Sequence, residues 1–190
     1  MANDTDRQAE ILAEYAEMRA AEARDEFVNN VSDWVEPSAT PIERLMAIGL
    51  IFAIQSEAWF GFPPQNNEFY LAESEGDAFV VPVFGPSIYI WQQVKVDKYK
   101  ADFVVRFAHW RGGAVFGAIE CDGHNHHDLT KEQAIHDRER DRHFQARGII
   151  ILRYTGKEIY RNPLKCAADA LGILERRAED PSAPRWKEGT

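Results

Sequence analysis

Hydrophobic residues recur at helical spacing in the first stretch of the chain, residues 7–31, which is rich in Ala and Glu. Ile11, Tyr15 and Met18 form a thin apolar stripe there, and this spacing predicts an amphipathic helix. The stripe is wide enough to dock on the body of the protein or on a partner. Prolines at positions 37 and 41 then interrupt the pattern. We therefore expect an N-terminal helical segment, residues 1–36, that is distinct from the rest of the chain.

A second helix is predicted to begin at Thr40 as N-cap, with Pro41 in its first turn, and to run to about Trp59. From Leu45 onward this segment is apolar on every side, which predicts that it is buried. Five strand-like segments come next, separated by turns that contain glycine. They cover residues 68–72, 78–84, 88–96, 100–107 and 114–121.

The last third of the chain alternates between helix and strand. Thr130 and Gln133 have the spacing of a capping box at the start of a charged helix, which is expected to end before Gly148. A buried strand at 149–153 and a helix at 163–178 come after it, and a flexible tail is expected over residues 179–190. This order predicts a mixed central sheet flanked by helices, an α/β (α+β) fold, in one domain spanning residues 38–178.

The distribution of charge matters more than its total. A formal net charge of -9 argues at first against a polyanionic partner. Residues 1–36 hold ten acidic and three basic residues, so the remaining chain carries only -2, with 19 Lys and Arg. The two cysteines are too few for a disulfide framework or a zinc ribbon. With neither a secretory signal nor an apolar run long enough for a bilayer, we expect a cytoplasmic protein without membrane association.

Acidic residues lie near the ends of two neighbouring predicted strands that are otherwise apolar on both faces. Alternation places Asp102 on one face of the first strand, and Glu120 and Asp122 on one face of the next. Burying carboxylates is costly unless a positive group compensates, and a hard oxygen-ligated cation such as Mg²⁺ does so economically. The structural alternatives are an ion pair of Asp102 with Lys95 or Lys100, and a turn role for Asp122.

These acids belong to a longer pattern that resembles the very-short-patch-repair-like branch of the PD-(D/E)xK nuclease superfamily. Between residues 38 and 174 the chain carries, in order, Gln93, Asp102-Phe103, Glu120-x-Asp122-Gly123-x-x-His126, Asp137, Arg140-Asp141, Gly148, Ile151-Leu152-Arg153-Tyr154, Glu158 and Asn162-Pro163. The resemblance implies a restriction-endonuclease-like αβββαβ core and hydrolysis of phosphodiester bonds in DNA. It also implies Mg²⁺ as the cofactor, which Mn²⁺ can replace.

The resemblance further implies roles for individual residues. Asp102 and Glu120 would be metal ligands, joined by Asp122 and by the backbone carbonyl of Cys121. Glu43 matches a catalytic acid that the superfamily often adds from its first core helix. Thr40-x-x-Glu43 also has the spacing of a capping box, and a first-turn Glu can serve both purposes.

Asp122 stands where the superfamily usually has a lysine that orients the attacking water and stabilises developing negative charge. An aspartate can ligate a metal or act as a base, but it cannot stabilise negative charge. The resemblance implies that His126 or His127 then supplies general acid/base function. The substitution is usual in this branch, so it does not indicate an inactive enzyme.

The histidines also permit a second interpretation. His124, His126 and Asp128 alternate in the manner of the opening of a metallo-β-lactamase-type zinc motif. Leu129 stands where that family has another histidine, and the chain is short for that fold. A zinc-dependent hydrolase is therefore a minor alternative, beside a polar surface loop with no ligand role.

The charged helix after the histidines is typical of a solvated, ion-paired surface. Arg138 and Arg142 are four residues apart and could nevertheless contact DNA phosphates, with Lys131 and Arg111 as further contacts. We therefore expect a Mg²⁺-dependent DNA endonuclease. The alternative is a catalytically inactive nuclease-like module that binds nucleic acid or a protein partner, and the acidic N-terminal helix suits such a partner or a homodimer contact.

Overall fold

The computed structural model describes residues 39–55, 67–71, 87–109, 113–123 and 131–183, together with isolated residues between 12 and 35. The chain divides into two units, residues 1–34 and residues 35–190. In the first unit, the described residues between 12 and 29 are helical, and Leu12, Tyr15 and Met18 are exposed. Tyr15 and Met18 belong to the predicted apolar stripe.

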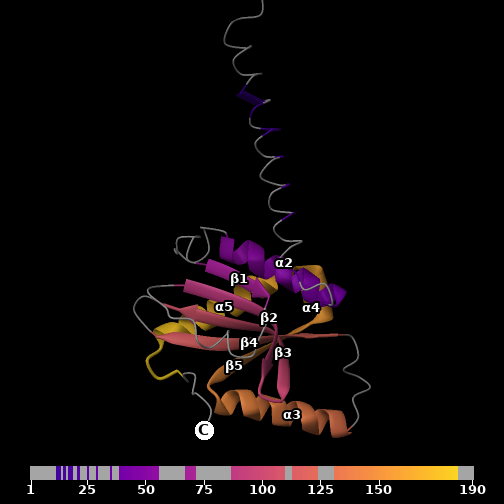
Figure 1. The fold of residues 1–190 in the computed structure, drawn as a ribbon, viewed down its shortest axis with the longest axis vertical. Helices are drawn as coiled ribbons and strands as arrows, with labels where there is room; N and C mark the ends of the chain where they lie inside the picture. The colour runs from indigo at the N-terminus through magenta and orange to yellow at the C-terminus, as the bar shows by residue number, and fades with distance from the viewer. Residues whose placement is uncertain are drawn as a thin grey trace, which may run out of the picture. The chain divides into compact units, whose positions relative to one another are not determined.

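The second unit is built on a five-stranded mixed sheet (Figure 1). Its strands stand in the order β1-β2-β3-β4-β5; β1–β2 and β4–β5 are parallel, and the two central pairs are antiparallel. The elements in chain order are α2 (Pro41–Gln55), β1 (Asn67–Leu71), β2 (Ser87–Val96), β3 (Tyr99–Ala108), β4 (Ala114–Asp122), α3 (Lys131–Ala146), β5 (Ile149–Thr155), α4 (Gly156–Arg161) and α5 (Pro163–Glu179). The predicted fold class and αβββαβ core are confirmed, with β1 added at one edge.

Helices cover both faces of this sheet. On one face, Phe144 of α3 is fully buried in a cluster with side chains of β2, β3, β4 and β5. On the other face α5 packs so closely on β4 that a Cβ added at Gly117 would come within 2.7 Å of Leu174 Cδ2. Helix α2 in turn packs on α5, where a Cβ at Gly49 would lie 2.6 Å from the Pro163 carbonyl oxygen. The sheet therefore lies between α3 on one face and α5, backed by α2, on the other.

Two predictions about the helices differ from the structure. Helix α2 is not buried all round, because Ile48 and Phe52 are exposed. Helix α4 was not predicted, although Thr155 and Glu158 form a complete capping box at its start. At six residues, α4 is too short to show a helical hydrophobic period.

Some predicted segments lie wholly or partly outside the described residues. These are the strand at 78–84, the end of the second helix near Trp59, and residues 184–190 of the expected tail. The first tail residues form a turn in which Ser182 donates to Asp180 and Ala183 is buried. No helix among the described residues is long and apolar enough to cross a membrane.

Candidate active site

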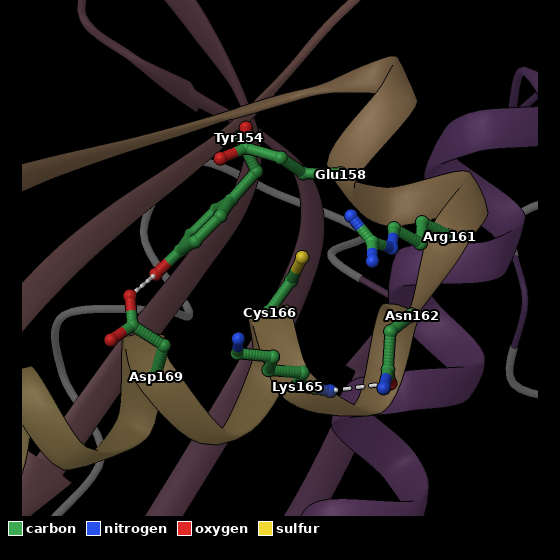
Figure 2. A pocket seen from close by; sticks show the side chains of 7 residues that line it. All are labelled: Tyr154, Glu158, Arg161, Asn162, Lys165, Cys166 and Asp169. Carbon is green, nitrogen blue, oxygen red and sulfur yellow. Dashed lines mark hydrogen bonds between the residues drawn. The ribbon is translucent and has the colours of Figure 1, made fainter.

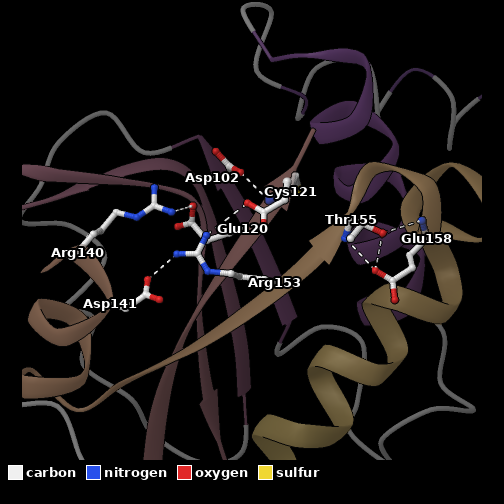
Figure 3. Close-up of polar contacts among 9 residues, drawn as sticks. Asp102, Glu120, Cys121, Arg140, Asp141, Arg153, Thr155 and Glu158 are labelled. Carbon is white, nitrogen blue, oxygen red and sulfur yellow. Dashed lines mark hydrogen bonds and ion pairs between the residues drawn. The ribbon is translucent and has the colours of Figure 1, made fainter. Parts of the chain in front are cut away.

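The sheet opens at Asp102, because neither neighbouring ladder includes this residue. Pairing between β2 and β3 passes from Gln92↔Phe103 to Val94↔Ala101, and the β3–β4 ladder stops at Phe103↔Ile119. Its side chain bonds to the backbone of β4 instead, because Asp102 Oδ2 accepts a hydrogen bond from the Cys121 N–H at 2.7 Å (Figure 3). Asp102 therefore binds to β4, and the alternative of an ion pair with Lys95 or Lys100 is not seen; those two lysines lie opposite each other, exposed.

Glu120 is the most deeply buried acid of the site, with 4% of its surface exposed. Its Oε2 pairs with Arg140 Nη2 of α3 at 3.1 Å (Figure 3), whereas its Oε1 is buried and makes no hydrogen bond to the described residues. Burial raises the pKa of Glu120 to about 8, and the charge of Arg140 opposes this shift. Burial and then the charge of Glu43 raise the pKa of Asp102, while the Cys121 hydrogen bond lowers it.

A second arginine, Arg153 of β5, sits beside these acids because β4 and β5 pair in the register Glu120↔Arg153. Its guanidinium bridges Asp122, at 3.3 Å, and Asp141 of α3. Asp122 therefore lies at the site rather than in an isolated turn. Arg140 of α3 and Arg153 of β5 thus contact the two acids of β4, Glu120 and Asp122.

Glu43 reaches the same end of the sheet from the first turn of α2. It forms the predicted capping box with Thr40, each side chain accepting from the other residue's backbone N–H. Its Oε2 also accepts from Gln93 Nε2 at 3.0 Å, so one carboxylate caps the helix and contacts β2. Gln93 has a φ of 55°, a left-handed conformation that is unfavourable for a residue of this type. The backbone at Gln93 is strained where its side chain meets Glu43.

Residues 87–173, from β2 into α5, match the sequence profile of the family described as REase_MTES_1575, a restriction-endonuclease-like family. The match covers a little under half of the chain. It supports a restriction-endonuclease-like nuclease. Comparison with curated proteins and with solved structures gave no match.

The donors at this nuclease-like site suit a divalent cation in kind. Glu43, Asp102, Glu120 and Asp122 offer only oxygen atoms, the ligands that Mg²⁺ prefers, and Glu120 Oε1 has no other partner among the described residues. In the arrangement described, however, no three His, Cys, Asp or Glu side chains of the described residues are placed to hold a metal ion. Glu120 and Asp122 instead point their oxygens at Arg140 and Arg153. The residue types therefore fit a divalent cation, but these two carboxylates would have to leave their arginine partners to bind it.

Some predicted site residues lie outside the described part of the chain. His124, His126, His127 and Asp128 fall in residues 124–130, and Arg111 falls in residues 110–112. Lys131 begins α3, but its side chain is not described. Arg138 and Arg142 are exposed on α3. The structure therefore unites the carboxylates and leaves the roles of the histidines and of the exposed basic residues as predictions.

Three residues at the site were not predicted to have a role of their own: Gln93, Arg140 and Arg153. All three belong to the pattern that carries the resemblance. Arg140 could have been found from helical spacing, because Asp137, Arg140, Asp141 and Phe144 share one side of α3 and Phe144 points into the core. Nothing in the sequence indicates the left-handed backbone of Gln93.

A cavity of about 510 Å³ lies on the other face of β5, between this strand and α4 and α5 (Figure 2). Tyr154 donates to Asp169 at 2.7 Å, and Arg161 and Lys165 line the cavity together with Glu158. Because successive residues of a strand point to opposite faces, the side chains of Tyr154 and Arg153 lie on opposite faces of the sheet. The cavity is therefore separate from Asp102, Glu120 and Asp122, none of which lines it.

Proposed function

We propose that this protein is a divalent-metal-dependent DNA endonuclease of the very-short-patch-repair-like PD-(D/E)xK type, using Mg²⁺ or Mn²⁺. One observation carries the proposal: a half-buried carboxylate, Asp102, and a buried one, Glu120, lie on adjacent strands, and Glu120 keeps one buried oxygen without a partner among the described residues. Such an arrangement is unfavourable for folding by itself. The restriction-endonuclease-like profile over the same strands supports the same conclusion.

In this proposal the protein's own residues have separate tasks. Asp102 and Glu120 hold the cation, with Asp122 and the Cys121 carbonyl as further ligands and Glu43 as an additional acid. The cation supplies charge stabilisation at the phosphate and activates water for attack. The water oxygen bonds to phosphorus as the bond from phosphorus to the leaving oxygen breaks. His126 or His127 takes the proton from the water or delivers one to the leaving oxygen.

The competing candidate is an inactive nuclease-like module. It is favoured by the ion pairs of Arg140 and Arg153, which balance the acids without a metal. A zinc hydrolase based on His124, His126 and Asp128 remains the minor alternative. A nicking assay with supercoiled plasmid, run with Mg²⁺, Mn²⁺, Zn²⁺ or a chelator, separates the three.

The assay should compare the parent with Asp102→Asn and Glu120→Gln, which keep side-chain size and remove one charge. Glu139→Gln is the matched control, because Glu139 is an exposed acid of α3. We expect Mg²⁺-dependent nicking by the parent and the control and none by the two site variants. Nicking by Asp102→Asn at the parent's rate, or a parent protein that never nicks, would refute the proposed activity.

A further inference from the structure

The acid cluster includes Asp122, which cannot stabilise developing negative charge, and the structure brings Arg140 to the same cluster through its ion pair with Glu120. Arg140 comes from the middle of α3, and its side chain is 18% exposed, whereas the neighbouring Arg138 and Arg142 are exposed. Burial of Phe144, one turn further along the helix, fixes the side of α3 that faces the sheet. Arg140 is therefore directed at Glu120 by the packing of α3 and not by a chance surface contact.

Hydrogen bonding at this ion pair is incomplete on both sides. Arg140 uses Nη2 toward Glu120, but its Nε is buried and has no hydrogen-bond partner among the described residues, as is true of Glu120 Oε1. A guanidinium has five N–H donors in a planar fork that matches two oxygens of a carboxylate or phosphate. Buried donors and acceptors without partners are rare in proteins, so Arg140 Nε and Glu120 Oε1 both retain the capacity to bind a further group.

Arg153 does not have this spare capacity. It already bridges two carboxylates, Asp122 and Asp141, which fixes its guanidinium between β4 and α3. Arg140 is thus the basic residue at the site that one carboxylate holds with a single ion pair. If Glu120 turned both oxygens to a cation, Arg140 would lose that partner while remaining beside the reacting centre.

We propose that Arg140 changes partner during the reaction, so that it supplies the positive charge that Asp122 cannot. Without metal it pairs with Glu120 Oε2; with metal and DNA bound, its guanidinium donates to the non-bridging oxygens of the scissile phosphodiester. There it stabilises the negative charge that develops as water attacks. This inference rests on the proposed endonuclease function and assigns its substrate contact to a residue of α3.

The test uses Arg140→Ala and Arg140→Lys in the full-length protein, with Arg176→Ala as the matched control. Arg176 is an exposed arginine of α5, a helix that covers the opposite face of the sheet. Removing one preorganised donor to developing charge typically costs about 10²- to 10³-fold in rate. We expect Arg140→Ala to lose nicking rate to that extent at saturating Mg²⁺ and DNA, Arg140→Lys to retain part of it, and Arg176→Ala to match the parent.

Mg²⁺ affinity, measured by calorimetry without DNA, gives the readout that is independent of activity. Arg140→Ala should bind Mg²⁺ as tightly as the parent or more tightly, because a cation that competes for Glu120 is gone. Should Arg140→Ala fail to fold, Arg140→Gln takes its place, since it keeps a donor toward Glu120 and removes the charge. Weaker Mg²⁺ binding together with slow nicking would make Arg140 a structural residue and overturn the inference. Nicking by Arg140→Ala within a fewfold of the parent's rate would also overturn the inference, while the endonuclease proposal would stand. If the parent itself does not nick, the endonuclease proposal is refuted, and the inference about Arg140 is refuted with it.

Discussion

Metal binding at Glu120 should be coupled to the loss of one proton. Its pKa is raised to about 8, so in the metal-free protein most molecules carry a protonated Glu120 at pH 7. The groups that face it are Arg140 from α3, Arg153 from β5, Asp102 from β3 and Asp122 on its own strand. Burial outweighs the two arginines. A cation must therefore displace a proton as well as Arg140.

The magnitude is set by the pKa. Below pH 8 the ionised fraction of Glu120 falls tenfold per pH unit, so apparent Mg²⁺ affinity should rise about tenfold per unit between pH 6 and 8 and level off above. The stability of the metal-free protein should change in the opposite sense. Because the folded pKa lies above the unfolded value of 4.5, the folded state binds more protons between these values. The free energy of unfolding should fall with rising pH in that window, by up to about 1.4 kcal/mol per unit.

Isothermal titration of the parent with Mg²⁺ at pH 6, 7 and 8, in buffers of different ionisation enthalpy, measures both the affinity and the number of protons released. Glu120→Gln is the control, because it cannot ionise; we expect it to lose the pH-dependent fall in stability and to bind no Mg²⁺. An affinity that stays constant from pH 6 to 8, with no proton released, would show that Glu120 is already ionised. The two arginines would then outweigh burial, contrary to the reasoning above.

Other substitutions test separate parts of the site. Gln93→Gly relieves the left-handed strain, so the melting temperature should stay or rise while nicking slows; a parent-like rate would leave Gln93 no role in holding Glu43. His126→Ala should lower the nicking rate about 10²- to 10⁴-fold without weakening Mg²⁺ binding, and Asp122→Asn should weaken that binding. Replacing Arg138 and Arg142 with Ala should reduce the salt dependence of DNA binding by about one unit of log–log slope per lost phosphate contact, a change that binding data over roughly 50–200 mM salt would reveal or exclude.

The elements that the sequence predicted well include the two strands that carry Asp102 and Glu120. Both are apolar on both faces, and their observed bounds differ from the predicted ones by no more than one residue. Their adjacency could be predicted from the glycine-containing turn that separates them. Helix α2 is apolar on every side, so its sequence does not distinguish the outer side from the inner one. For this reason Ile48 and Phe52 were predicted to be buried.

The basic side of the site was harder to predict. Helix α3 is rich in charged residues, and Phe144 is one of the few apolar residues on its inward side. The sequence therefore does not distinguish Arg140 from the solvated arginines of the same helix. A charged residue is placed inward by a partner from a distant strand, and a single sequence does not reveal that pairing. The strained backbone of Gln93 is equally hidden, because it depends on a contact with a helix about fifty residues earlier.

The close approach of α2 and α5 at Gly49 makes the acid site vulnerable from a distance. Gly49 carries no chemistry, yet any side chain there would meet backbone atoms of α5 that cannot swing aside. Helix α2 would have to tilt or slide, and Glu43, six residues earlier in the same helix, would move with it. A screen for variants that inactivate this protein should therefore recover position 49 alongside the carboxylates, as a loss of alignment in a protein whose ligands are all intact.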